Sequence, residues 1–356
     1  MLTIRTLSVK NAFAALLCIS FVAFFSFVFS TIVDENSTIT DARTYYFFYN
    51  LLVSEGAQAF ADLLTLQTGK MELGIYLTVY AFFSYFITDL QDFAFSCIFV
   101  VLSLLAVFVY CSARKVDIPP LRSLWLVGIS VFIFTLWYPS YASVLWVWRS
   151  HIAFTLLFIG MLSGRFFVCF ILIIASVVFH YSSAILAVVV GAIFLFSNRF
   201  YTISVGTKFF VSLVVGLGAS LLVGFLKQAV ATGDGVWESD TNAGFFVYIY
   251  VFLFVVVLLF LFNQRRVLDI DLSPDELAML SRLFCVVLFF LGLAATSVNS
   301  HQDLMRIMQP AFVILPMVYM IFLNKSKSFI RVLLLAILMP GMIMGIKSAY
   351  VYWGGV

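Results

Sequence analysis

Long apolar segments separated by short polar loops run through most of the chain. The first, Asn11–Val33, has the length that a helix needs to cross a bilayer. Further segments of this kind are Phe93–Cys111, Leu124–Tyr138, Val147–Ser163, Phe166–Phe179, Ser183–Ser197, Phe209–Leu226, Gly244–Phe262, Leu283–Val298, Ala311–Leu323 and Ser328–Ile346. The pattern predicts an all-α polytopic membrane protein with about eleven transmembrane helices, since a helix satisfies its own backbone hydrogen bonds in lipid.

One apolar segment, Leu73–Ile87, is too short to fit this pattern easily. Basic residues concentrate on the cytoplasmic side of membrane proteins, and their distribution here predicts a cytoplasmic N-terminus. If Leu73–Ile87 crossed the membrane completely, Arg114 and Lys115 would face outward. We therefore expect a re-entrant or partial segment that returns to the outer face near Asp89 and Asp92.

The longest polar stretch is the predicted outer loop 34–72. Within it, Tyr45–Leu66 places apolar residues at helical spacing and predicts an amphipathic helix at the membrane interface. No soluble domain or internal repeat interrupts the chain. We therefore expect residues 1–356 to form a single transmembrane domain.

Composition agrees with a membrane protein and excludes several function classes. Only 10% of the 356 residues are charged, and the mean hydropathy is +1.13, which is too apolar for a soluble globule. The net charge of +3 is explained by cytoplasmic anchors and does not indicate nucleic-acid binding. The five cysteines are scattered and show no metal-binding spacing. We expect no metal site and no cofactor.

The predicted cytoplasmic loop Asn263–Ser281 carries a helix start signal. Ser273, Pro274 and Glu276 stand in the positions of an N-cap, an N1 proline and an N3 glutamate. This signal predicts a capped helix and needs no function.

Arg149 and His180 are the most informative polar residues. Arg149 enters an apolar segment from the predicted outer side, where arginine is disfavoured and costs roughly 2.5–3.5 kcal/mol at a helix centre. It is either a lipid-bound surface residue or a guanidinium that holds phosphate. His180 interrupts the apolar run between Phe166 and Phe196, and imidazole suits proton transfer near neutral pH.

Other polar residues fall on the same predicted outer face. Asp41 and Glu72 flank the amphipathic helix, and Arg306 lies in the late outer loop, three residues after Asp303. The candidate catalytic residues are Asp41, Glu72, Arg149, His180 and Arg306, and the candidate substrate-binding residues are Arg43, Tyr45, His151, His301 and Asp303. Such a set suits an anionic lipid-linked substrate: arginines neutralise a phosphate leaving group, and a carboxylate or histidine accepts a proton from an attacking hydroxyl.

The order of these residues resembles the EpsG-type, or Wzy-type, polysaccharide polymerases of bacterial inner membranes. The resemblance is carried by Asp41 followed by Tyr45 and Tyr46, by Glu72-Leu-Gly74-Ile-Tyr76, by Arg149 with Ala153, by Phe179-His180-x-Ser182-Ser183, and by Arg306. It covers most of the chain in order, but each motif is short. Arg149 is followed by Ser150 rather than the usual glutamine, and Arg306 lacks the usual tyrosine after it.

The resemblance implies a glycosyltransferase with a fold like that of the GT-C enzymes. Such enzymes join undecaprenyl-pyrophosphate-linked oligosaccharide repeat units at the periplasmic face of the inner membrane, and so build O-antigen, capsular or exopolysaccharide. It implies that Arg149 and Arg306 bind pyrophosphate, that Asp41 or Glu72 is the base, and that His180 orients or shares the proton. A chain-length regulator and a flippase are the partners expected by analogy with the family.

Two other functions use similar chemistry. A flippase or transporter of lipid-linked oligosaccharide predicts charged residues at mid-membrane and internal repeats, which are not evident here. An O-antigen ligase needs the same pyrophosphate site, and its usual sign is a large late outer loop. The segments Lys227–Ala243 and Asn299–Arg306 are both short, which favours the polymerase.

Overall fold

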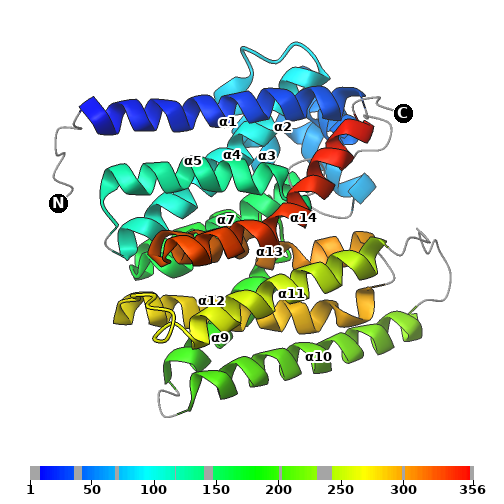
Figure 1. Cartoon of the computed structure of the whole chain (residues 1–356). Helices are drawn as coiled ribbons and strands as arrows, with labels where there is room; N and C mark the ends of the chain where they lie inside the picture. The colour runs from blue at the N-terminus through cyan, green and yellow to red at the C-terminus, as the bar shows by residue number, and fades with distance from the viewer. Residues whose placement is uncertain are drawn as a thin grey trace. The chain divides into compact units, whose positions relative to one another are not determined.

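The computed structural model describes residues 9–35, 42–68, 72–116, 118–139, 147–199, 203–230, 243–298 and 301–352. This described part is helical and contains no strand (Figure 1). Its helices are α1 (Val9–Glu35), α2 (Ala42–Thr68), α3 (Gly74–Phe83), α4 (Leu90–Lys115), α5 (Pro120–Leu136), α7 (Trp148–Ser163), α8 (Phe166–Phe179), α9 (Ser183–Arg199), α10 (Val205–Val230), α11 (Ala243–Asn263), α12 (Pro274–Leu293), the short 3-10 helix η1 (Ala294–Ser297), α13 (His301–Lys325) and α14 (Ser328–Tyr352).

Seven of these helices are long and apolar enough to cross a membrane. They are α1, α4, α10, α11, α12, α13 and α14, and the described part also contains shorter apolar helices, α3, α5, α8 and α9. The expected polytopic, all-helical architecture is therefore confirmed in this coarse form. The count of about eleven transmembrane helices and the GT-C-like fold stay predictions.

The chain divides into two compact units by its internal contacts. One comprises Met1–Ala187 with Met344–Val356, and the other comprises Val188–Ile343. The single domain expected over residues 1–356 stays a prediction.

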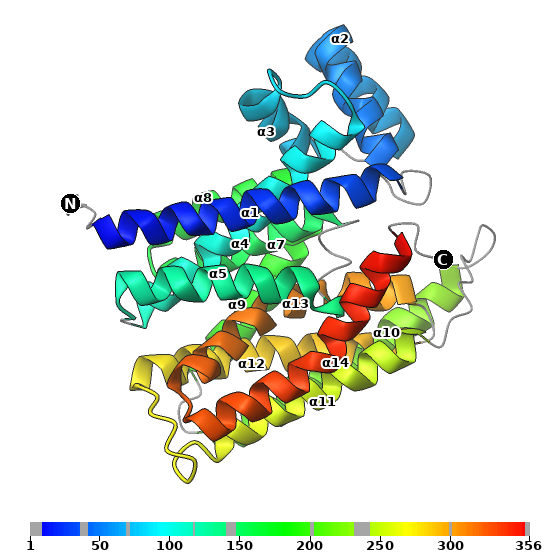
Figure 2. The same ribbon diagram turned by 45° about the horizontal axis from the view of Figure 1, so that its top comes forward.

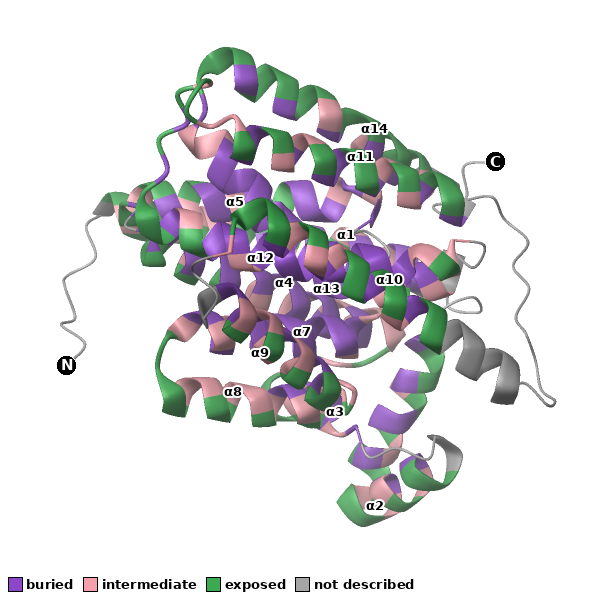
Figure 3. Ribbon diagram, turned by 90° about the horizontal axis from the view of Figure 1, so that it is seen from below, coloured by how far each residue is buried: buried purple, intermediate pink, exposed green. Residues whose placement is uncertain are grey.

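The first unit is built around α4, which packs against α1, α5 and α7. Its core side chains are large and apolar, and Phe93, Phe108 and Phe158 are completely buried. α7 packs closely against α8, whereas α8 itself buries little of its apolar surface (Figure 3). An apolar helix with so little protein cover is typical of one that faces lipid.

The helices α2 and α3 pack together and lie to one side of α1 (Figure 2). α2 includes the whole of the predicted helix Tyr45–Leu66. It is kinked at Gly56, where φ is 85°. Glycine fits this position because it adopts positive φ without a Cβ clash. The side chains of Phe48 and Phe60 are buried, while Glu55 and Asp62 are exposed. The place of α2 at a membrane interface stays a prediction.

In the second unit, α10 and α12 approach each other so closely that their backbones touch. A Cβ added at Gly216 would lie 2.1 Å from the Phe289 carbonyl oxygen, and one added at Gly292 would lie 2.4 Å from the Leu213 oxygen. One helical turn further on, the hydroxyls of Ser220 and Thr296 lie 2.5 Å apart. Small residues spaced by four positions allow this contact, as is common between helices in membranes.

The start of α12 is capped as its sequence predicts. The Ser273 hydroxyl accepts a hydrogen bond from the Glu276 backbone N–H, and the Glu276 carboxylate accepts one from the Ser273 N–H. Glu276 is fully buried, and its other carboxylate oxygen lies 3.0 Å from Lys325 Nζ at the end of α13. The capping residue therefore also ties α12 to α13.

The close contact between α10 and α12 predicts that Gly292→Ala destabilises the protein. The added methyl group meets backbone atoms that cannot rotate away, so we expect the free energy of unfolding to fall by about 1–3 kcal/mol. Gly218→Ala on α10 is the matched control, because a Cβ there meets nothing within 4 Å. Denaturant unfolding in detergent measures both variants. Equal stability of Gly292→Ala and the wild type would contradict the observed packing.

Candidate functional site

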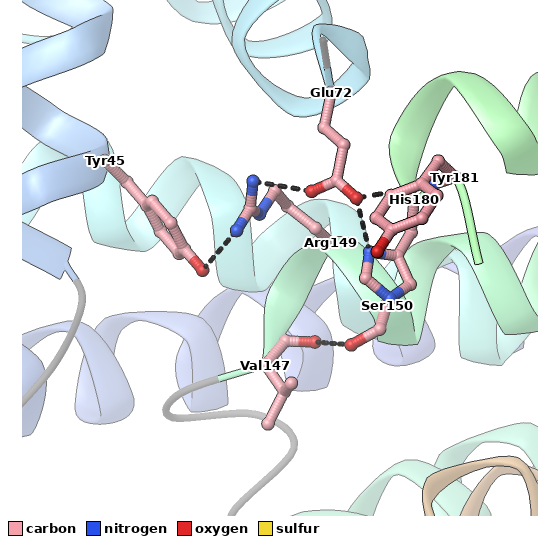
Figure 4. A network of polar contacts seen from close by, with 7 residues as sticks. All are labelled: Tyr45, Glu72, Val147, Arg149, Ser150, His180 and Tyr181. Atoms are coloured by element: carbon pink, nitrogen blue, oxygen red, sulfur yellow. Dashed lines mark hydrogen bonds and ion pairs between the residues drawn. The ribbon is translucent and has the colours of Figure 1, made fainter. Parts of the chain in front are cut away.

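Four segments of the first unit bring polar side chains together in apolar surroundings (Figure 4). Glu72 directly precedes the N-cap of α3, Arg149 lies in the first turn of α7, and His180 is the C-cap of α8. Tyr45 comes from the first turns of α2. Three of the four therefore stand at or beside helix ends.

The Glu72 carboxylate is the centre of this cluster. Its side chain is 2% exposed, and its Oε2 lies 2.7 Å from Nη1 of Arg149. Its Oε1 lies 2.8 Å from Nδ1 of His180 and accepts a 3.3 Å hydrogen bond from the Tyr181 backbone N–H. Both carboxylate oxygens are thus occupied.

Arg149 joins this carboxylate to the tyrosine on α2. Its second terminal nitrogen donates a 3.2 Å hydrogen bond to the Tyr45 hydroxyl, and the guanidinium carbon lies 4.7 Å from the centre of the Tyr45 ring. The pair combines a hydrogen bond with a cation–π contact. About a fifth of the Arg149 side chain (22%) remains exposed.

Glycine at position 74 allows Glu72 to reach the cluster. A Cβ on Gly74 would lie 2.7 Å from Cγ and 2.9 Å from Cα of Phe179. The start of α3 therefore packs directly on the last residue of α8, and His180 follows immediately. Glu72 and His180 are held together by this contact between the two helix ends, which explains why a glycine stands two residues after the glutamate.

The environment of Glu72 favours its charged form. Burial alone raises the pKa of this carboxyl, but the contact with His180, the charge of Arg149 and the Tyr181 N–H outweigh it, so the pKa lies below its ordinary value. The start of α7 adds the positive end of its helix dipole to the charge of Arg149. The positive charge of the site therefore favours a bound anion. In this structure that anion is the Glu72 carboxylate.

Arg149 and His180 are the partly exposed members of the cluster. Nδ1 of His180 faces the Glu72 carboxylate, so Nε2 is the ring nitrogen on the side away from Glu72. The His180 side chain is 24% exposed. The ring is fixed by an edge contact with Phe154 of α7. The arrangement places an imidazole beside a guanidinium, the two side-chain types that suit proton transfer and the binding of a negative charge.

The structure unites Glu72, Arg149, His180 and Tyr45, four of the residues that the sequence singles out. Asp41 lies outside the described residues. Arg43 is exposed on α2, and His151 is completely buried on α7, where its ring centre lies 5.0 Å from that of Phe134. The substrate-binding roles of Arg43 and His151 stay predictions.

Three further candidates lie on α13 in the second unit. α13 begins at His301, so Asp303 and Arg306 belong to its first turns and not to a loop. Arg306 is exposed and Asp303 half-buried, whereas the His301 side chain lies outside the described residues. Their relation to Glu72 stays a prediction.

Aromatic side chains pack around Tyr45, a grouping that the sequence analysis does not predict. The Tyr45 ring packs against Tyr76 and Trp148, with centres 6.4 and 5.9 Å apart. Trp148 is buried next to Arg149. The motif Trp-Val-Trp-Arg in the sequence gave a signal for this grouping, but only the fold shows that it surrounds Tyr45. No cluster of metal-ligating side chains is found among the described residues.

Comparison with known proteins gives no match: no family model, no curated protein and no solved structure is similar to the chain at a significant level.

The burial of Glu72 predicts a pH-dependent effect of Glu72→Gln. At neutral pH we expect the free energy of unfolding to fall by about 1–3 kcal/mol, because Arg149 loses its charged partner. The folded-state pKa lies below the ordinary value of 4.5, so the contribution of the carboxylate is complete above pH 4.5 and is lost as the pH falls through the folded-state value.

Unfolding in detergent at neutral pH and at successively lower pH tests this, with Glu55→Gln as the control, since Glu55 is exposed on α2. The difference between Glu72→Gln and the wild type should shrink in acid. A difference that stays constant would show that the charge of Glu72 is not what stabilises the site.

Proposed function

We propose that the chain is a membrane-embedded glycosyltransferase that polymerises undecaprenyl-pyrophosphate-linked oligosaccharide repeat units. The observation that supports this is the contact of Glu72 with Arg149 and His180. These residues come from three short motifs, far apart in the chain, that carry the resemblance to Wzy-type polymerases. Their meeting around the buried carboxylate of Glu72 supports a common chemical role for the three motifs.

In the proposed reaction, His180 is the base. Nε2 accepts the proton of a hydroxyl on the acceptor sugar, whose oxygen bonds to the anomeric carbon of the donor. The bond between that carbon and the pyrophosphate oxygen breaks, and the pyrophosphate leaves with the bonding electron pair. Arg149 stabilises the growing negative charge, for which a guanidinium is well suited.

Glu72 is assigned a positioning role instead of the role of base that the sequence left open for it. Its two oxygens are occupied by Arg149, His180 and Tyr181, and its pKa is lowered. A carboxylate in this state is a weak base, but it keeps the proton on Nδ1 of His180 and stabilises the imidazolium that forms. This is the role of a carboxylate beside a catalytic histidine in other enzymes.

The proposal includes the remaining expectations from the sequence. The site would face the periplasm at the inner membrane of a bacterium, Arg306 would bind the second pyrophosphate, and the fold would resemble that of GT-C enzymes. The seven apolar helices agree with a multi-pass membrane protein. A chain-length regulator and a flippase remain the expected partners.

Polymerisation in vitro tests the proposal. Purified protein in nanodiscs is mixed with undecaprenyl-pyrophosphate-linked repeat units of the native strain, and the products are resolved as a ladder. We expect His180→Ala and Arg149→Ala to lower the rate by at least about 100-fold, the usual size of a general-base or charge-stabilising contribution. Arg331→Ala is the control, because Arg331 is exposed on α14.

The products separate the proposed function from its alternatives. A ladder that persists in folded Arg149→Ala and His180→Ala proteins would refute the site. Transfer of the glycan to lipid A core without a ladder would identify a ligase. Movement of the substrate across a vesicle membrane without any new glycosidic bond would identify a flippase.

A further inference from the structure

The helix α3 and the turn after it expose a concentration of large apolar side chains. Leu77 is 43% exposed, Phe82 and Phe86 are each 73% exposed, and Tyr85 is 95% exposed. The opposite face is buried: Ile75, Tyr76 and Val79 are at most 1% exposed. α3 therefore packs one face on protein and leaves the other face and its C-terminal tip uncovered.

Contacts with the next helix, α4, indicate where this uncovered surface lies along a potential membrane span. α4 is one of the seven helices that can span a membrane, and it begins at Leu90. The Phe83 ring at the end of α3 packs against Phe99 of α4, with centres 6.0 Å apart. Phe99 lies nine residues after Leu90, about 14 Å along the helix at 1.5 Å per residue. The tip of α3 is thus beside the interior of a spanning helix, not above its start.

Several polar groups of the chain that returns from this tip to α4 form hydrogen bonds within the protein. The Phe86 N–H donates to the Phe83 carbonyl, and the Thr88 N–H and hydroxyl both donate to the Asp92 carboxylate, at 2.9 and 2.6 Å. The Tyr46 hydroxyl of α2 donates to the Thr88 carbonyl. Irregular backbone within a bilayer requires such partners, because lipid offers none.

We propose that α3 and residues 84–86 form a re-entrant arm that lies in the leaflet that α4 enters at Leu90. Its surface for phospholipid acyl chains consists of Leu77, Phe82, Tyr85 and Phe86. The helix has 10 residues, about 15 Å at 1.5 Å per residue, which reaches roughly half-way through a hydrocarbon core of about 30 Å. Asp89 and Asp92 mark the point where the arm returns to the polar surface.

This arm connects the lipid to the candidate site. Glu72 lies two residues before α3, and Gly74 fixes the start of the helix on Phe179. The depth at which α3 lies in the leaflet therefore fixes the depth of the Glu72 carboxylate. This inference concerns the membrane contact and does not depend on the proposed glycosyltransferase activity.

Photo-crosslinking in nanodiscs tests the arm. The photoreactive residue p-benzoylphenylalanine replaces Phe82 in one protein and Phe86 in another, and irradiation is followed by intact-protein mass spectrometry. We expect adducts that carry the mass of one phospholipid, because the probe at either position would touch acyl chains. The two positions are tested in separate proteins, so that if one variant folds poorly, the other still tests the proposal.

Two reference positions calibrate the yield. Ile19 is 57% exposed in the middle of the spanning helix α1 and should give the yield of a lipid-facing residue. Glu55 is exposed on α2 and gives the yield of a polar surface. A yield at Phe82 or Phe86 equal to that at Ile19 supports the arm. Yields at both positions as low as at Glu55, or crosslinks to protein alone, would overturn it.

Discussion

The buried carboxylate of Glu72 is the constraint on which the first unit of the structure depends. An ionised group with a 2% exposed side chain is stable only if it is paired. Arg149 and His180 supply that pairing, so the start of α7 and the end of α8 must meet in front of α3. The position of three helix ends thus follows from the need to satisfy one charge in apolar surroundings.

Close backbone contact is the second condition for this arrangement. Gly74 lets α3 touch Phe179, and in the second unit Gly216 and Gly292 let α10 touch α12. Where lipid surrounds the helices, burial of apolar side chains drives their association only weakly, and tight packing with interhelical hydrogen bonds takes its place. Glycine at a helix contact therefore allows close packing both between α10 and α12 and beside the candidate site.

The proposed function and the proposed lipid arm both require a polar site that lies next to the lipid. In the proposed function, a substrate with a charged head and an isoprenoid tail would meet the protein where polar and apolar surroundings adjoin. Arg149 and His180 are both partly exposed within an apolar unit, and the proposed arm would connect Glu72 to the leaflet through α3. A reaction on the head of such a lipid needs its catalytic groups at a fixed depth, which a short embedded helix can provide.

The hydrophobic pattern by itself determined that the chain is a helical membrane protein and placed most helices close to their true bounds, because spanning length and apolar composition are local properties. α8 begins at Phe166 and ends at Phe179 as predicted, and Ser273 and Glu276 form the predicted cap.

The sequence also singled out Glu72, Arg149 and His180, since charged and titratable residues stand out in apolar segments. It could not decide that Glu72 is held by both others, that His151 turns into the core against Phe134, or that Arg306 belongs to a helix. Only the tertiary structure decides such pairings, because they depend on how helix ends far apart in the chain meet in space.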